Sequence, residues 1–139
     1  MPKWINKTSL ILLIILWGFT GVHYQDLPDS IPIHFNALGE PDNFGSRIHS
    51  WGIPIIAFLL YVLLSKISTR KKIHLNEVKI IAWLQLGIVF LFTYLQVNVF
   101  LVSLGHIEGL GIGFLPFSIV LLLVPSIVVM LQKKVKTNR

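Results

Sequence analysis

The sequence predicts an all-α membrane protein, a four-transmembrane-helix bundle with a structured extracellular loop between helices 1 and 2. Of its 139 residues, 54% are hydrophobic and only 13% are charged, and the mean hydropathy is +0.75. These values lie outside the usual range of soluble domains. The apolar residues form long continuous runs instead of alternating with polar ones, which favours helices over a transmembrane β-barrel. We treat residues 1–139 as a single membrane domain.

The first two predicted spans cover about residues 4–24 and 51–67, and the second is short for a membrane crossing, as is the apolar part of the first. The uninterrupted apolar stretch of the first covers only residues 10–22, a length that is also typical of a signal peptide. Trp4 and Tyr24 extend this stretch to the two membrane interfaces, where aromatic side chains are favoured. No small-residue cleavage site follows it, so we predict an uncleaved helix.

The third and fourth predicted spans, about residues 78–102 and 109–131, each exceed the roughly 20 residues that a helix needs to cross the hydrocarbon. The third carries a stripe of polar side chains, because Gln85 and Gln96 return to the same face after three turns and Thr93 lies one turn before Gln96. Such side chains commonly hydrogen-bond to neighbouring helices. The alternative is a hydrophilic path for a substrate.

The distribution of Lys and Arg predicts the orientation. With the N-terminus and the C-terminus both cytoplasmic, eleven of the twelve cations fall on the inner side, and Arg47 alone lies outside. This asymmetry is a strong positive-inside signal for a multi-pass protein of the cell membrane. The net charge of +6 is then explained by topology and by attraction to the lipid bilayer. The basic loop 66–79 therefore needs no nucleic-acid partner to explain it.

The outer loop, residues 25–50, contains the polar residues from which a site could be built. We expect a short strand over residues 33–36, with Ile33 and Phe35 docked onto the helix ends and the alternating polar residues, His34 and Asn36, facing the other way. Residues 37–42 carry turn-forming side chains. We expect the polar side of the strand and the turn to gather a cluster that binds a ligand or structures the loop: His34, Asn36, Gly39, Asp42 and Arg47.

This loop resembles the signature of a bacterial family, the domain-of-unknown-function family 1648 (DUF1648). The pattern, which follows a first transmembrane helix, is Leu-Pro-x-x-Ile-Pro-x-His-Phe/Trp-x-x-x-Gly-x-x-Asp. The sequence agrees with it at Leu27, Pro28, Ile31, Pro32, His34, Phe35, Gly39 and Asp42. Proteins containing this domain are similar to the membrane immunity protein of the sporulation-delaying toxin system. The resemblance implies protection against, or binding of, a peptide toxin or another envelope-directed agent at the outer membrane–water interface.

Two other functions remain open. The chain could be an accessory subunit of a membrane transporter, with a larger membrane partner on the polar stripe and the first two helices. It could also be a membrane enzyme that uses His34 and Asp42 as acid and base, with a metal held by His23, His34, His49 and Asp42. Zinc accepts such ligands, but the spacing matches no compact metal motif. We therefore expect no catalytic residues, no metal, no cofactor and no enzymatic activity.

Overall fold

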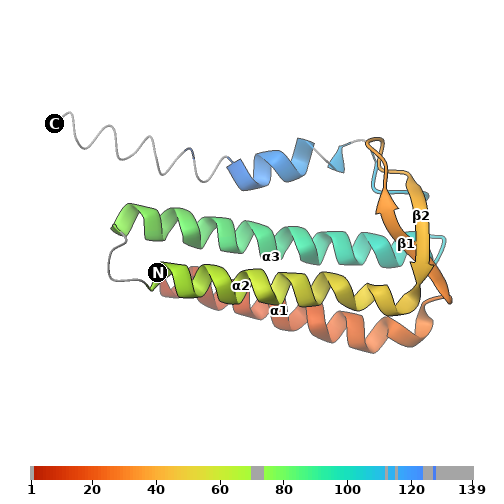
Figure 1. Ribbon diagram of the computed structural model, residues 1–139, viewed down its shortest axis with the longest axis horizontal. Coiled ribbons are helices and arrows are strands. Elements are labelled where there is room, and N and C mark those ends of the chain that lie inside the picture. Colours follow the sequence, from red (N-terminus) through yellow and green to blue (C-terminus); the bar gives the residue numbers. More distant parts are fainter. Residues whose placement is uncertain (1, 70–73, 112, 115, 124–126, 128–139) are drawn as a thin grey trace.

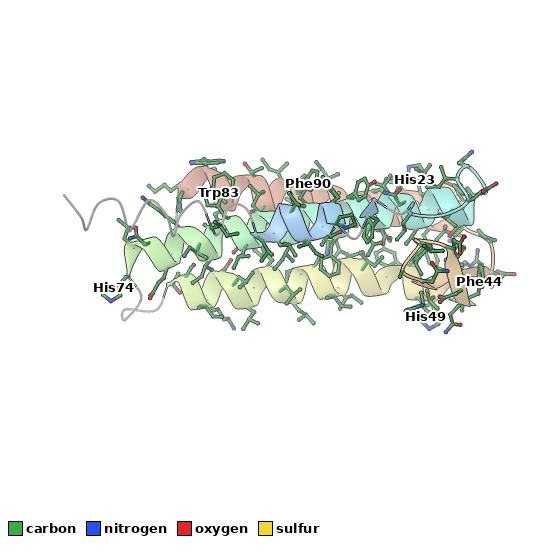
Figure 2. The ribbon with its side chains drawn as sticks, turned by 90° about the horizontal axis from the view of Figure 1, so that it is seen from above. His23, Phe44, His49, His74, Trp83 and Phe90 are labelled. Atoms are coloured by element: carbon green, nitrogen blue, oxygen red, sulfur yellow. The ribbon has the colours of Figure 1, made fainter. Side chains whose placement is uncertain are left out.

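The computed structural model of the chain describes residues 2–69, 74–111, 113, 114, 116–123 and 127. Three long helices lie alongside one another, and a two-stranded antiparallel hairpin lies across one end of them, which we call the hairpin end (Figure 1). Figure 2 shows His23, Phe44 and His49 at the hairpin end and His74 at the opposite end. The elements follow in the order α1 (Lys3–His23), η1 (Tyr24–Asp26), β1 (Ser30–Phe35), β2 (Pro41–Ser46), η2 (Arg47–Trp51), α2 (Gly52–Ser68) and α3 (Leu75–Ser103).

Within the described residues, three helical segments are long and apolar enough to cross a membrane, namely Lys3–Asp26, Arg47–Ser68 and Leu75–Ser103. These segments indicate a membrane protein and correspond to the first three predicted spans. The second is longer than predicted, since η2 leads directly into α2 and the whole segment has 22 residues. The predicted fourth span, about 109–131, lies partly outside the described residues. Of it, residues 114, 116–123 and 127 are helical.

The third span also begins earlier than predicted, at Leu75 instead of Val78. A capping box explains this start, because the Glu77 carboxylate accepts a 3.0 Å hydrogen bond from the backbone N–H of His74. Such a box satisfies backbone groups that the first turn of a helix leaves without partners.

One polar cluster joins α1, α2 and α3 near the end that lies opposite the hairpin. The Asn6 side-chain oxygen accepts hydrogen bonds from the Tyr61 hydroxyl and the Gln85 amide, both at 3.2 Å. The Ser65 hydroxyl donates to the other side of the Gln85 amide at 3.1 Å. Gln85, which is fully buried, therefore cross-links the helices, as polar side chains in membrane bundles commonly do.

A second polar cluster joins α1, η2 and α3 near the hairpin end. The buried Gln96 amide donates to the Thr20 hydroxyl at 3.0 Å and to the Ser50 carbonyl at 3.1 Å. Thr93 does not take part, because its hydroxyl donates to the Val89 carbonyl of its own helix at 2.8 Å. The predicted stripe of Gln85, Thr93 and Gln96 is thus two separate cross-links with a locally bonded threonine between them.

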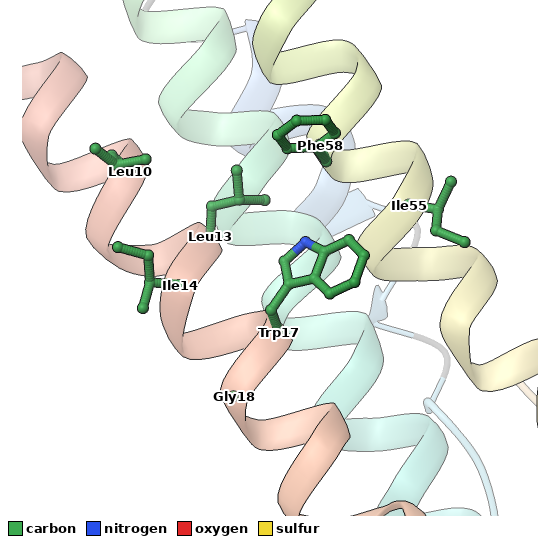
Figure 3. A pocket seen from close by; sticks show the side chains of 7 residues that line it. All are labelled: Leu10, Leu13, Ile14, Trp17, Gly18, Ile55 and Phe58. Atoms are coloured by element: carbon green, nitrogen blue, oxygen red, sulfur yellow. The ribbon is translucent and has the colours of Figure 1, made fainter.

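An apolar groove of about 740 Å³ opens between α1 and α2 (Figure 3). Trp17 reaches across the groove from α1 towards Ile55 of α2, and Phe58 lies at the side of α2. No charged side chain of the described residues lines it, and its walls come from two segments that are apolar enough to span a membrane. The lining residues are Leu10, Leu13, Ile14, Trp17, Gly18, Ile55 and Phe58.

The hairpin is fixed to the helices by a small apolar cluster. Leu27, Ile31 of β1 and Phe100 of α3 are almost fully buried, and Phe19 and Tyr24 pack against them. The prediction that Ile33 docks onto the helix ends is therefore wrong, since Ile33 is 44% exposed whereas Ile31 is 1% exposed. The register shifts between Pro32 and His34 explain the difference, because an irregularity breaks the simple alternation of faces along a strand.

Candidate binding site

The hairpin is more extensive than the short strand that the sequence predicted. β1 begins at Ser30 instead of Ile33, and β2, Pro41–Ser46, covers a segment of which only the first residues were predicted, as part of a turn. The two strands pair antiparallel, with register shifts on both sides of His34. The sequence of β2 is PDNFGS, and Pro, Asp, Asn and Gly are poor strand formers. Pairing with β1, not intrinsic preference, makes this segment a strand.

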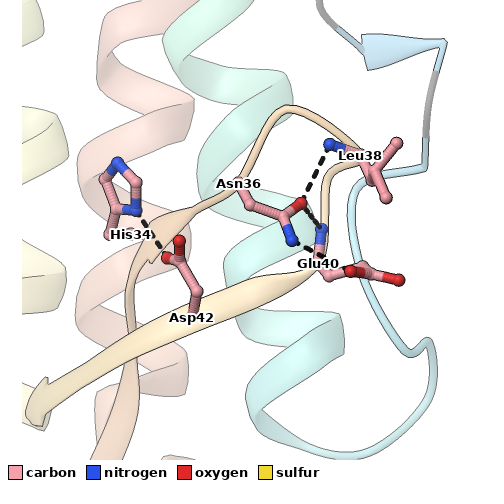
Figure 4. A network of polar contacts seen from close by, with 5 residues as sticks. All are labelled: His34, Asn36, Leu38, Glu40 and Asp42. Atoms are coloured by element: carbon pink, nitrogen blue, oxygen red, sulfur yellow. Dashed lines mark hydrogen bonds and ion pairs between the residues drawn. The ribbon is translucent and has the colours of Figure 1, made fainter.

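His34 and Asp42 face each other across the hairpin (Figure 4). Nδ1 of His34 lies 2.5 Å from Oδ1 of Asp42, and the two side chains are 64% and 43% exposed. A pair this exposed adds little to stability, because water competes for both partners. The structure therefore brings together two residues of the predicted cluster and leaves their polar atoms accessible to a partner in the water phase.

Asn36 and Glu40 form a second, separate pair at the tip of the hairpin (Figure 4). The Asn36 side-chain oxygen accepts hydrogen bonds from the backbone N–H groups of Leu38 and Glu40 at 2.9 and 3.0 Å, and its amide donates to the Glu40 carboxylate at 2.9 Å. An asparagine bonded in this way to the following backbone structures a turn. The sequence analysis did not select Glu40, and its turn position between Gly39 and Pro41 was the available signal.

The tip of the hairpin is held by the segment that follows α3. The Gly39 carbonyl accepts a 2.7 Å hydrogen bond from the backbone N–H of Leu110. Gly39 has φ +81°, and a Cβ atom at this position would lie 2.7 Å from the carbonyl oxygen of Gly111. A Cβ atom on Gly109 would overlap the carbonyl oxygen of Gly39. Only glycines allow these two backbone segments to approach so closely.

Arg47 lies at the other end of the hairpin and does not complete the His34 cluster. Its guanidinium lies 3.6 Å from the Asp29 carboxylate and 5.7 Å from the centroid of the Tyr24 ring. It also donates to the Leu27 carbonyl at 3.5 Å. The prediction that Arg47 joins His34 and Asp42 is wrong, because Arg47 begins η2 and ties that turn to the chain before β1.

The histidines considered for a metal site are engaged separately. His23 contacts the Asp26 carboxylate at 3.0 Å, and Nδ1 of His49 donates to the Ser46 carbonyl at 2.7 Å. Within the described part of the chain, no three His, Asp or Glu side chains gather where they could hold a metal ion. The structure does not bring His23, His34, His49 and Asp42 together as a ligand set.

A cavity of about 410 Å³ lies beneath β1, where the hairpin meets η2 and the adjoining ends of α2 and α3. Its wall is mainly apolar, with His49 and Ser50 as polar members. The Ser50 hydroxyl is buried and has no hydrogen-bond partner among the described residues. Sequence reasoning could not locate this cavity, because its wall comes from four elements: Ile31, Pro32, Ile33, Phe35, His49, Ser50, Gly52, Ile53, Ile56, Leu95 and Val99.

The two ends of the described structure differ in charge. Arg47 is the single Lys or Arg that the described residues place at the hairpin end, and it lies beside Asp29. Five of the six acidic residues of the chain belong to this end, which is therefore acidic: Asp26, Asp29, Glu40, Asp42 and Glu108. The described cations of the opposite end are Lys3, Lys7, Lys66 and Lys79.

The segment that contains this hairpin is similar to known proteins. Residues 11–58 match the family model described as domain of unknown function DUF1648, which confirms the predicted resemblance over that part of the chain. An uncharacterized protein of Archaeoglobus fulgidus is 44% identical over 45 residues, which cover 32% of this chain and 25% of the relative. The match thus spans about a quarter of that relative's length. No solved structure matches the chain.

Proposed function

We propose that this chain, which carries a DUF1648 domain at residues 11–58, is a membrane-bound binding protein that protects its cell. It captures a peptide or another envelope-directed agent at the outer membrane–water interface. The observation that supports this most is the hairpin itself, which the cluster of Leu27, Ile31 and Phe100 anchors across the end of three apolar helices. A polar hairpin fixed in this position forms a platform where the helices end.

The platform has the two features that a binding site at an interface requires. The cavity beneath β1 supplies an apolar wall. The exposed His34–Asp42 pair supplies hydrogen-bonding groups, and His34 lies in β1 between Ile33 and Phe35, which both line the cavity. Ligand sites in proteins generally combine a mainly apolar pocket with a few placed polar groups. Because the hairpin tip is already held by Leu110, little ordering would be needed on binding, which favours affinity.

The proposed outer location rests on the charge rule. The described cations Lys3, Lys7, Lys66 and Lys79 lie at the end opposite the hairpin, and basic residues favour the cytoplasmic side of a membrane. The hairpin would then meet agents that arrive from outside before they enter the bilayer.

A growth assay with a matched pair of histidine variants tests this function. Deleting the gene should sensitise the host to at least one agent in a panel of envelope-active peptides, and the intact gene should restore resistance. His34→Ala should abolish the rescue because Asp42 loses its partner, whereas His106→Ala, an exposed histidine at the same end, should rescue fully. Protein abundance in the membrane must be equal for both variants. Unchanged sensitivity of the deletion strain across the panel would contradict the proposal.

A second function, as an accessory subunit of a membrane transporter, is favoured by the groove between α1 and α2. The side chains of the described residues that line the groove carry no charge. Because its walls are apolar and belong to two segments that can span a membrane, a neighbouring transmembrane helix would pack there. Copurification of one larger membrane protein in mild detergent would support this function. It should be lost on Gly18→Trp, since Gly18 lines the groove and has free space around it. Purification of the chain alone under the same conditions would argue against it.

A further inference from the structure

We propose that the ligand of this site is a cationic amphipathic peptide. One apolar side chain of the peptide enters the cavity beneath β1, and its Lys or Arg side chains lie against the carboxylates of Glu40 and Asp42. The inference rests on the proposed binding function and names the chemical class of the ligand.

The cavity beneath β1 is the proposed site for the apolar side chain of the peptide. Its volume of about 410 Å³ falls within the range of about 300–1,000 Å³ that is typical of ligand pockets. Ile33 and Ile56 line it and are 44% and 48% exposed, so the cavity is open to its surroundings at these residues. An apolar side chain that entered it would leave water and gain contacts with the aliphatic wall.

The carboxylates of Glu40 and Asp42 are the proposed site for the Lys or Arg side chains of the peptide. Glu40 and Asp42 flank Pro41, whose register partner is Phe35 in the cavity wall. Both residues are therefore sequence neighbours of the residue that pairs with the cavity wall, Glu40 just before β2 and Asp42 within it. Their partners are the Asn36 amide and the His34 ring, and neither forms an ion pair with a Lys or Arg in the part of the chain that the structure describes.

The excess of acidic residues at the hairpin end favours a cationic ligand. The described cation of this end, Arg47, already lies beside Asp29, at the opposite end of β2 from Glu40. An anionic peptide or a free phosphate would meet carboxylates here that no Lys or Arg of the described residues neutralises. A peptide that carries Lys or Arg next to a Leu or Trp residue complements both the charge and the cavity, and such complementarity steers association as well as specificity.

The test uses the full chain in nanodiscs of phosphatidylcholine, with two fluorescent synthetic peptides as probes. The peptides share the same Leu and Trp positions, and they carry either Lys or Gln at every polar position. Fluorescence polarisation measures binding, and empty nanodiscs give the background. The Lys peptide should bind the protein about tenfold more tightly than the Gln peptide, and this advantage should shrink as salt is raised.

One variant tests the contribution of the carboxylates to binding, and a second tests the contribution of the cavity. The double variant Glu40→Gln, Asp42→Asn should weaken the Lys peptide about three- to tenfold, the effect of losing two partly exposed ion pairs, and should leave the Gln peptide unchanged. Ile56→Trp, which fills the cavity from a half-exposed position, should weaken both peptides. The matched controls lie elsewhere and should have no effect: Glu77→Gln at the opposite end, and Leu59→Trp, an exposed α2 residue outside the cavity.

The outcomes distinguish this inference from the proposed function. Equal binding of the two peptides, or full binding of the Lys peptide by the double variant, would overturn the cationic class and leave capture of an apolar ligand intact. Binding of neither peptide above the empty nanodiscs would also overturn the inference. In that case the growth assay still decides independently whether the chain protects its host.

Discussion

The backbone N–H of Leu110 donates a 2.7 Å hydrogen bond to the carbonyl of Gly39, which joins the chain after α3 to the tip of the hairpin between α1 and α2. At its base the hairpin is held by the cluster of Leu27, Ile31 and Phe100. The hairpin is therefore fixed at two places that lie at its opposite ends. A binding surface held in this way can keep the His34–Asp42 pair and the cavity in a constant relative position.

The first prediction concerns this tip contact. Gly109→Ala should release the tip of the hairpin, because the new Cβ atom would overlap the Gly39 carbonyl oxygen. Overpacking of this kind costs about 1–3 kcal/mol, and local opening can relieve it. Hydrogen exchange should show faster exchange of the Leu110 amide and of the hairpin. Gly113→Ala, where a Cβ atom meets no described residue within 4 Å, is the control, and unchanged exchange in Gly109→Ala would refute the close approach.

The second prediction separates a cross-linking polar residue of α3 from a local one. Gln85→Leu should lower the free energy of unfolding by roughly 1 kcal/mol, since it removes hydrogen bonds to Asn6 and Ser65 and such bonds average about 0.6 kcal/mol in membrane bundles. Thr93→Val should change it by less than about 0.5 kcal/mol, because the hydrogen bond that the Thr93 hydroxyl makes to the described residues stays within its own helix. Unfolding of the purified protein in sodium dodecyl sulfate measures both values. Equal effects would contradict the assignment of Gln85 as a cross-link.

The helices were predictable from the sequence because length and hydropathy determine them directly. The runs that contain Leu13, Ala57 and Val89 are long and apolar, and these three residues belong, with Leu16, to one core cluster of the bundle. The ends were less predictable. The extension of the second span depends on η2, which continues the helical path before Gly52, and composition carries no signal for such a continuation.

The site was predictable only where its contacts are local. Asn36 stands next to turn residues, and its role in the turn follows from that position. The contact of His34 with Asp42 was expected from the turn between them, but the strand that carries Asp42 was not, because PDNFGS has a low strand preference. Contacts between residues far apart in the sequence could not be predicted from it. The contacts of Arg47 with Asp29 and Tyr24 are an example. The close approach of Gly39 to the segment after α3 could not be predicted from the sequence either.

The central claim is that the hairpin stands on the outer surface of the membrane, and the reactivity of a single cysteine tests it most directly. The chain contains no cysteine, so Asn43→Cys, at an exposed position of β2, introduces one thiol. It should react with a membrane-impermeant thiol reagent in intact cells, whereas Thr69→Cys, exposed at the opposite end, should react only after lysis. Labelling of the Asn43→Cys protein only after lysis would place the hairpin inside the cell and contradict the account.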